Sequence, residues 1–187
     1  MFQVRLHGRG GQGVVSAAEM LSVAAFLEGH HAQAFPSFGS ERTGAPVVSF
    51  CRIDDKAIRL REPILEPDAL IVQDTTLFNA VHVFDGLRPS GYVLINSGKA
   101  LSELDVGNAL RALPDGHVRL IPATELAMRH VGRPVPNAAL IGAFAAVSGL
   151  LHMESVESAI REKFGGAIGD GNVAAARAAY DSAMATA

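Results

Sequence analysis

Three glycines near the start of the chain stand at a spacing that suits anion binding. Gly8, Gly10 and Gly13 satisfy G-x-G-x-x-G in the stretch HGRGGQGV, between a strand-like and a helix-like segment. Such a turn bends the backbone sharply and directs free N–H groups toward an anion, and the arginine inside it would add a charged donor. The pattern predicts a phosphate contact, with close packing as the alternative interpretation. The residues concerned are Gly8, Arg9, Gly10, Gly11, Gln12 and Gly13.

A dinucleotide site of this type also expects an acidic residue at the end of the second strand, where it holds a ribose. The second strand-like segment ends at Phe35-Pro36, and the next carboxylate is Glu41. The missing acid argues against an ordinary dinucleotide site. It leaves open a free-standing nucleotide-binding α/β module.

A second loop, PSFGSERTGAPV, follows that strand. It is polar, glycine-rich and aromatic, and it lies where open α/β sheets place ligand sites, at the carboxyl end of the strands. Taken alone, Glu41 is equally well a solvated surface charge. The candidate functional residues in the loop are Ser37, Phe38, Gly39, Glu41, Arg42, Thr43 and Gly44.

The chain lacks the residues for most catalytic sites. Cys51 is its one cysteine, whereas an iron-sulfur cluster needs about four thiolates and a structural zinc about four Cys or His ligands. The seven histidines never recur at helical spacing, so we predict no metal site. A lone cysteine in an apolar strand is expected to be a buried hydrophobe and fits a cytoplasmic protein. We find no acid–base pair, so we predict a binding or completing module without a catalytic residue.

One motif misleads. Gly169-Asp170-Gly171 is similar to the start of a thiamine diphosphate motif, which closes with a later asparagine, but none follows Asn172. We therefore expect Asp170 to act as the N-cap of the last helix.

The composition fits one globular core. The chain has 187 residues, of which 49% are hydrophobic and 19% charged, with a net charge of −3. Mixed charges offer no basic surface for nucleic acid, and Met1–Leu6 is expected to be a strand, not a secretory signal. The uncharged stretch from Pro134 to Met153 contains only a short unbroken apolar run, so a buried helix is expected instead of a membrane span.

Strand-length apolar runs alternate with helix-length amphipathic stretches, which favours parallel strands with helical crossovers. We predict one domain over residues 1–187: an α/β fold, a three-layer α/β/α sandwich with a mostly parallel Rossmann-like sheet and a helical C-terminal third. The expected strands are Phe2–His7, His31–Phe35, Val47–Ile53, Ala69–Gln73, Tyr92–Asn96 and Val118–Pro122, with a short antiparallel one at Ala57–Leu60. The expected helices are Gly13–Glu28, Thr76–Val83, Glu103–Ala112, Thr124–Val131, Ala138–Leu151, Val156–Phe164 and Asn172–Met184.

Taken together, the two loops resemble a known family. HGRGGQGV followed by PSFGSERTGAPV is similar to the gamma subunit of the pyruvate/2-oxoacid:ferredoxin oxidoreductases, which include ketoisovalerate- and phenylglyoxylate-type enzymes. The likeness continues through Asp54, Arg59 and Arg61, through PDALIV and through NAALIG, and covers essentially the whole chain. Thr43 departs from the pattern, because many relatives have glycine there.

The resemblance implies a subunit of a 2-oxoacid:acceptor oxidoreductase, acting on the oxo group of its donor and converting a 2-oxoacid to an acyl-coenzyme A. Its partners would be thiamine-binding alpha and beta subunits and a ferredoxin-like delta subunit. Thiamine diphosphate, Mg and 4Fe-4S clusters would reside there, with coenzyme A as co-substrate and electrons passing to ferredoxin or, through an FAD subunit, to NAD. This chain would shape the coenzyme A side, its second loop lying near the thiamine pocket. An indolepyruvate oxidoreductase beta subunit is an open sibling interpretation, and the particular acid stays open too.

Overall fold

The computed structural model describes residues 1–37, 43–106 and 108–185. Its strands are β1 (Phe2–Arg9), β2 (His31–Pro36), β3 (Pro46–Asp54), β4 (Ala69–Val72), β5 (Tyr92–Asn96) and β6 (Val118–Ile121). Its helices are α1 (Val14–Leu27), α2 (Ala123–Val131), α3 (Asn137–Ser148), α4 (Met153–Lys163) and α5 (Gly166–Ala185). Two short 3₁₀ helices, η1 (Thr75–Asn79) and η2 (Leu101–Glu103), complete the described elements.

The strands form one six-stranded mixed sheet in the order β2-β3-β1-β4-β5-β6. β1, β4, β5 and β6 run parallel, whereas β3 is antiparallel to both of its neighbours, β1 and β2. Every residue of β4 is buried, as is typical of a central parallel strand. The parallel strands therefore end at one edge of the sheet, and β3 begins at that same edge.

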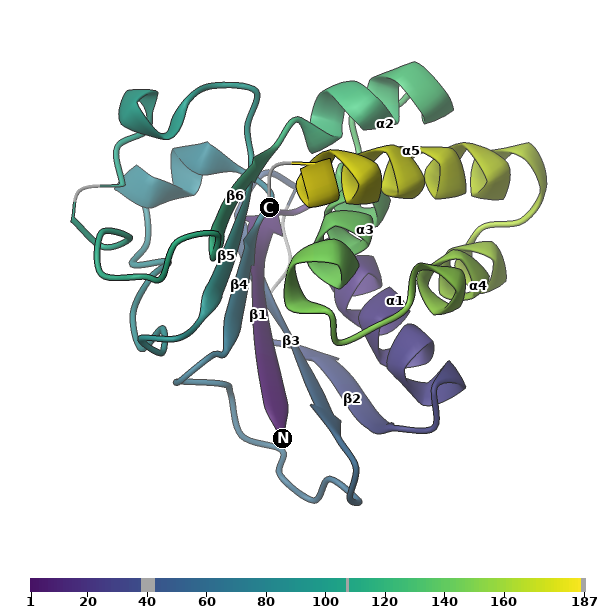
Figure 1. Cartoon of the computed structure of the whole chain (residues 1–187), viewed down its shortest axis with the longest axis horizontal. Coiled ribbons are helices and arrows are strands. Elements are labelled where there is room, and N and C mark those ends of the chain that lie inside the picture. The colour runs from purple at the N-terminus through teal and green to yellow at the C-terminus, as the bar shows by residue number, and fades with distance from the viewer. Residues whose placement is uncertain (38–42, 107, 186–187) are drawn as a thin grey trace.

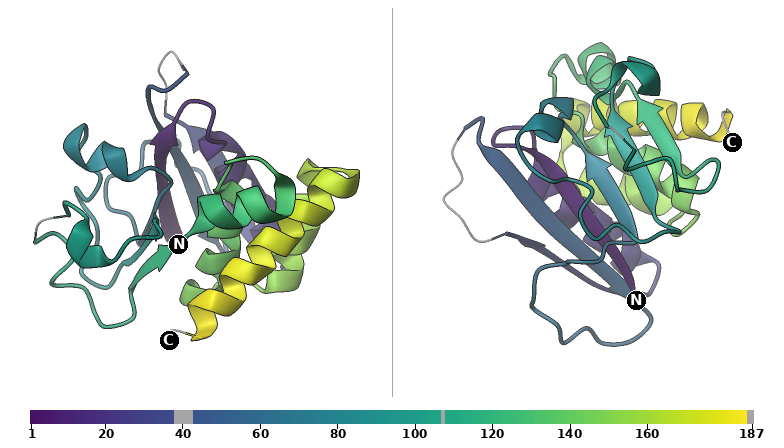
Figure 2. Two further views of the ribbon diagram at one scale, coloured as in Figure 1. Left: turned by 90° about the horizontal axis from the view of Figure 1, so that it is seen from above. Right: turned by 90° about the vertical axis from the view of Figure 1, so that its left-hand side faces the viewer.

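The helices cover one face of the sheet, and the 3₁₀ helices with their irregular connections cover the β4–β6 part of the other (Figure 1; Figure 2, left). The predicted α/β fold, mostly parallel sheet and helical C-terminal third are confirmed. Two predicted helices, Thr76–Val83 and Glu103–Ala112, are instead 3₁₀ turns and irregular chain over their described residues, which in the second range exclude residue 107. In the first, the Asp74 side chain accepts from the Thr76 N–H and begins a 3₁₀ turn. The second is interrupted in the sequence by Gly107-Asn108.

The predicted short strand Ala57–Leu60 is also wrong, because these residues are irregular. β3 already pairs with β1 on one side and β2 on the other, so it has no free edge for a hairpin partner.

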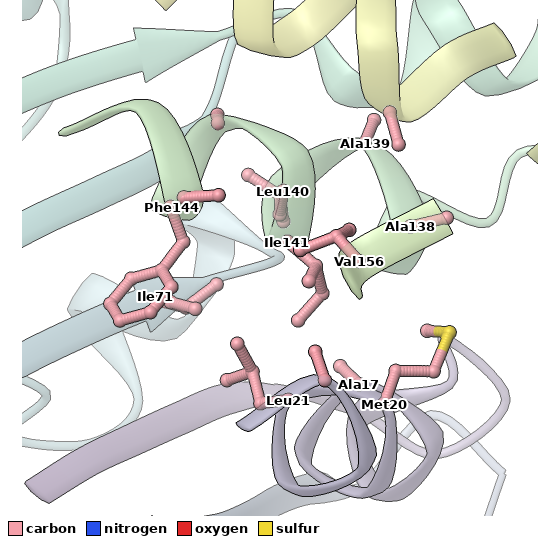
Figure 3. Packing of buried hydrophobic residues seen from close by; sticks show 14 of the residues in the cluster. Ala17, Met20, Leu21, Ile71, Ala138, Ala139, Leu140, Ile141, Phe144 and Val156 are labelled. Atoms are coloured by element: carbon pink, nitrogen blue, oxygen red, sulfur yellow. The ribbon is translucent and has the colours of Figure 1, made fainter. Parts of the chain in front are cut away.

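α3 is the centre of the helical layer (Figure 3). Leu140, Ile141 and Phe144 are fully buried. They pack among residues of α1, α4 and β4, including Leu21 and Ile71. The uncharged stretch from Pro134 to Met153 thus contains a core helix, α3, as predicted. No helix in the described ranges is long and apolar enough to cross a membrane.

Glycines let α5 lie unusually close to its neighbours. A Cβ on Gly142 of α3 would stand 2.1 Å from the carbonyl oxygen of Ala176 in α5. A Cβ on Gly171 would stand 2.5 Å from the carbonyl oxygen of His130 in α2. Two helices with side chains at these points could not approach so closely.

The start of α5 corrects a prediction. The helix begins at Gly166, so Asp170 lies inside it and is not its N-cap. The Asp170 carboxylate pairs instead with the Arg161 guanidinium of α4. The sequence predicted that this helix starts at Asn172, because glycines disfavour helices. In the structure Gly169 lies inside the helix, where the lack of a side chain permits close contact with the Phe164 carbonyl.

A buried basic pair lies on the face of β1 opposite the helices. Arg5 Nε donates to His7 Nε2 at 3.0 Å, and its Nη atoms donate to the carbonyls of Ile64 and Val83. Arg5 thereby fastens two long connections to the sheet. Burial, and secondarily the Arg5 charge, lowers the pKa of His7 to about 3, so this histidine is neutral in the folded protein.

We expect Gly142→Ala to destabilise the fold by about 1–3 kcal/mol, the usual range for overpacking, because the added methyl group meets backbone. Gly165→Ala is the matched control, since a Cβ there meets no atom within 4 Å. Urea unfolding measures both. Equal stability of the two variants would contradict the close α3–α5 contact.

The buried histidine predicts a pH dependence. Its pKa is about 6.5 when unfolded and about 3 when folded, so the unfolded chain binds more protons between these values and stability falls as pH falls below 6.5. His7→Gln removes this contribution, so the variant should gain on the wild type by up to roughly 1.4 kcal/mol per pH unit below that point. Urea unfolding at pH 7 and pH 5 tests it, with His31→Gln, at an exposed position, as control. Parallel pH profiles for wild type and His7→Gln would refute it.

Candidate functional site

Polar groups gather at the sheet edge where the parallel strands end. A cavity of about 490 Å³ lies there, lined by residues 10–12 after β1, 73–75 after β4, Asn96 of β5, Thr124 of α2 and the segment 134–136 before α3. Open parallel sheets commonly bind ligands at this edge, where the connections diverge to opposite sides. The glycine-rich turn predicted from the sequence forms one wall.

The glycines of this turn are required by its backbone. Gly11 and Gly13 adopt φ of 93° and 74°, which L side chains rarely adopt. A Cβ on Gly8 would stand 2.5 Å from Val14 Cγ2. Gly13 precedes α1, which has no side-chain cap, so the first N–H groups of that helix lack intrahelical partners.

Backbone hydrogen bonds join this turn to the end of the second loop. The Gly10 N–H donates to the Ala45 carbonyl at 2.9 Å, and the Gly44 N–H donates to the Gly10 carbonyl at 3.1 Å. A parallel bridge pairs Gly10 with Thr43. The structure thus brings the two sequence-predicted segments together.

Arg9 strengthens the same connection with its side chain. Nη1 donates to the Gly44 carbonyl at 2.9 Å, and Nη2 donates to Thr76 Oγ1 at 2.8 Å. Nε lies 3.4 Å from Asp74 Oδ2. The guanidinium therefore holds three segments of this chain together, whereas the sequence suggested a donor free for an outside anion.

Asp74 is the centre of this hydrogen-bond network. Its Oδ1 accepts from the Thr76 N–H at 2.9 Å and from the Thr76 hydroxyl at 2.6 Å. Its Oδ2 accepts from Gln12 Nε2 at 2.8 Å. Burial acts to raise the pKa of Asp74, but the hydrogen bonds from Thr76 and Gln12 and the Arg9 charge together lower it below its usual range. The carboxylate stays ionised and its charge is balanced by Arg9.

Sequence reasoning missed the far wall of the cavity. Asn96 Nδ2 donates to the Gln73 carbonyl at 2.9 Å and to Thr124 Oγ1 at 2.7 Å. The signal was available, because Gln73-Asp74 and Asn96 directly follow apolar strand residues. A ligand-binding acid is not to be expected at the end of β2, because β3 separates β2 from β1, and the strand beside β1 toward the cavity is β4.

The second loop is described only at its ends. The Ser37 N–H donates to the Val48 carbonyl at 2.8 Å, and Gly44 has φ of 80°. Thr43 and Gly44 are exposed beside the turn. Phe38, Gly39, Glu41 and Arg42 lie outside the described residues.

The residues at this edge are better suited to binding a ligand than to catalysing a reaction. Cys51 is fully buried, and burial raises the pKa of its thiol to about 12, so it cannot act as a thiolate at neutral pH. No group of three His, Cys, Asp or Glu side chains in the described ranges could hold a metal ion. This edge of the sheet offers backbone N–H groups, side-chain amides and hydroxyls.

Comparisons with known proteins agree over the whole chain. A family model described as pyruvate ferredoxin/flavodoxin oxidoreductase matches residues 3–182. The pyruvate/ketoisovalerate oxidoreductases common subunit gamma of Pyrococcus furiosus is 47% identical, covering 97% of this chain and 96% of the relative. The pyruvate synthase subunit PorC of Methanocaldococcus jannaschii is 47% identical, covering 98% of each.

A solved structure extends the likeness to three dimensions. The pyruvate oxidoreductase subunit PORC of Thermotoga maritima superposes with a TM-score of 0.79 at 34% identity, covering 96% of this chain and 95% of that one. The family match, the sequence identity and the shared fold all support one conclusion: the chain belongs to the pyruvate ferredoxin/flavodoxin oxidoreductase family.

Proposed function

We propose that this chain is the gamma subunit of a multi-subunit 2-oxoacid oxidoreductase, whose complex decarboxylates a 2-oxoacid oxidatively to an acyl-coenzyme A. The observation that carries the proposal is the end-to-end match with relatives named as such subunits, 97% of this chain against 96% of the Pyrococcus relative. That relative is named as common to pyruvate and ketoisovalerate oxidoreductases. A shared subunit supports the idea that other chains select the acid.

The redox and carbanion chemistry belongs to other subunits in this proposal. An iron-sulfur cluster needs about four thiolates, whereas this sequence contains one cysteine, which is buried in β3. Thiamine diphosphate and Mg would be held by alpha and beta subunits, and 4Fe-4S clusters by the beta or a ferredoxin-like delta subunit. Electrons would pass to ferredoxin, or to NAD where a further subunit carries FAD. We place the complex in the cytoplasm.

The chain's own part would be to form one side of the coenzyme A entrance, as a single gamma-type domain over residues 1–187. The turn Gly8–Gly13 would contact an anionic part of coenzyme A through its backbone N–H groups. The loop Ser37–Gly44, including Glu41 and Arg42, would face the thiamine-binding subunits. The hydrogen bond from Arg9 to the Gly44 carbonyl supports this arrangement, because it joins the turn to the end of the loop.

We test the proposal by purifying the tagged chain at native expression levels together with its bound partners. A thiamine-binding large subunit and a cysteine-rich subunit should be recovered, with coenzyme A-dependent oxidation of a 2-oxoacid by a dye acceptor. Recovery of the chain as a lone monomer would overturn the proposal.

A matched pair of glycine variants locates the contact. Gly44 and Gly29 both have positive φ and open space at the Cβ position, but only Gly44 lies beside the turn. Gly44→Leu should lower partner recovery several-fold, whereas Gly29→Leu, with the same kind of backbone strain, should preserve it. Equal recovery of partner subunits by the two variants would show that this edge is not part of the subunit interface.

A further inference from the structure

One side of the sheet ends at β2, whose outer edge pairs with no other strand of the described residues (Figure 1). The Ser37 N–H donates to the Val48 carbonyl at 2.8 Å, which fixes the hydrogen-bonding pattern between β2 and β3. Hydrogen-bonded and non-hydrogen-bonded pairs alternate in an antiparallel ladder, so the backbone groups of Gln33 and Phe35 point toward β3. The residues of β2 whose backbone groups point away from the sheet are Ala32, Ala34 and Pro36.

The outward backbone groups of Ala32 and Ala34 have no hydrogen-bond partner among the residues that the structure describes. Both residues are half-buried, and their methyl groups pack against the helical core. Their side chains therefore do not cover the edge. Unpaired N–H and C=O groups along a strand are a template for pairing with another chain.

The opposite edge of the sheet, β6, is protected in a way that β2 is not. The Val93 N–H donates to the His117 carbonyl, so the backbone groups of the next residue, Val118, point outward. Arg119 Nη1 donates to the Val118 carbonyl at 3.2 Å, and β6 has only four residues. A short strand with a charged residue is a common protection against edge pairing. β2 has six residues without Lys, Arg, Asp or Glu, and its proline protects only the last position.

The surroundings of the β2 edge favour a partner subunit over a second copy of this chain. The β2–β3 ladder continues through Ser37 into the second loop, which is proposed above to face the thiamine-binding subunits. Phe26 and Leu27, at the end of α1 just before the turn into β2, are 71% and 50% exposed. They provide apolar surface at the other end of the strand. A contact between two copies limited to this edge would be far smaller than the roughly 1,000 Å² that a specific interface buries.

From these observations we infer that an extended segment of a partner subunit adds to the sheet as a strand beside β2. Its main chain hydrogen-bonds the outward groups of Ala32 and Ala34, and its apolar side chains lie beside the end of α1. Affinity in such pairing comes from main-chain hydrogen bonds, so the segment has no proline at the paired positions. This inference rests on the proposed subunit role and specifies how the subunits meet.

Hydrogen–deuterium exchange at single-residue resolution, on the free chain and on the purified complex, tests the pairing. The Ala32 and Ala34 amides should exchange roughly tenfold more slowly in the complex, because they gain acceptors there. The Gln33 and Phe35 amides are already bonded to β3, so they serve as the internal control and should change much less.

Ala34→Pro is the matching variant, because it removes an outward N–H and leaves the inward hydrogen bonds of β2 in place. We expect recovery of partner subunits by the tagged chain to fall several-fold, while urea unfolding shows that the free chain still folds. Val118→Pro makes the same change at the free edge of β6 and should leave recovery as in the wild type. If Ala34→Pro does not fold, the exchange of the wild-type amides decides alone.

The outcomes separate this inference from the subunit proposal. Partner recovery together with Ala32 and Ala34 amides that exchange as fast as in the free chain would overturn this inference alone, as would unchanged recovery by a folded Ala34→Pro. Recovery of no partner by the wild type would overturn both proposals. Slower exchange of these amides in the isolated chain as its concentration rises would assign the edge to a second copy and contradict the inference.

Discussion

The organisation of the site depends on the ionic and hydrogen-bonded contact between Arg9 and its neighbours at the end of β1. The guanidinium reaches the Gly44 carbonyl, the Thr76 hydroxyl and the Asp74 carboxylate. Hydrogen bonds that involve charged groups are roughly twice as strong as neutral ones, and these connect segments that are far apart in sequence. Without this contact, the glycine-rich turn and the described end of the second loop would share only backbone hydrogen bonds. The turn and the start of η1 would be joined by the Gln12–Asp74 hydrogen bond.

The two faces of the sheet are covered in different ways. On the helical face, small residues and Gly142 bring α3 and α5 into backbone contact, which produces a closely packed layer. On the other face, Arg5 fastens long connections by donating to carbonyls, because those segments form few regular elements of their own. The packed face leaves the carboxyl edge as the place where polar groups are concentrated and where backbone N–H groups remain available.

Most of the fold could be predicted from the sequence, because its signals are local. Six apolar runs became the six strands, and the glycine-rich turn stands between strand and helix as expected. The insertion of β3 between β2 and β1 could not be predicted, since pairing order is a tertiary property. That insertion explains why the end of β2 was the wrong place to seek a ligand-binding acid. The predicted N-cap role of Asp170 and the predicted helix at Thr76–Val83 were wrong for a related reason. In both segments, contacts outside the local sequence pattern decided the structure.

The site was predicted in part. Its glycines follow from backbone geometry, which the sequence displays, whereas the partners of Arg9 depend on which strands end side by side. Asp74 and Asn96 carried a usable signal as polar residues directly after apolar strands. The match with the gamma subunit of Pyrococcus furiosus over 97% of this chain fits a domain whose edge is polar and whose one cysteine is buried.

The central claim is that this edge, formed by the turn and the end of the second loop, is where the chain meets its partner subunits. Hydrogen–deuterium exchange, measured on the free chain and on the assembled complex, tests it most directly. We predict slower exchange on assembly for peptides that contain Gly11 and Thr43, with little change in α4. Slower exchange confined to α4 and α5, with the turn and Thr43 unaffected, would contradict it.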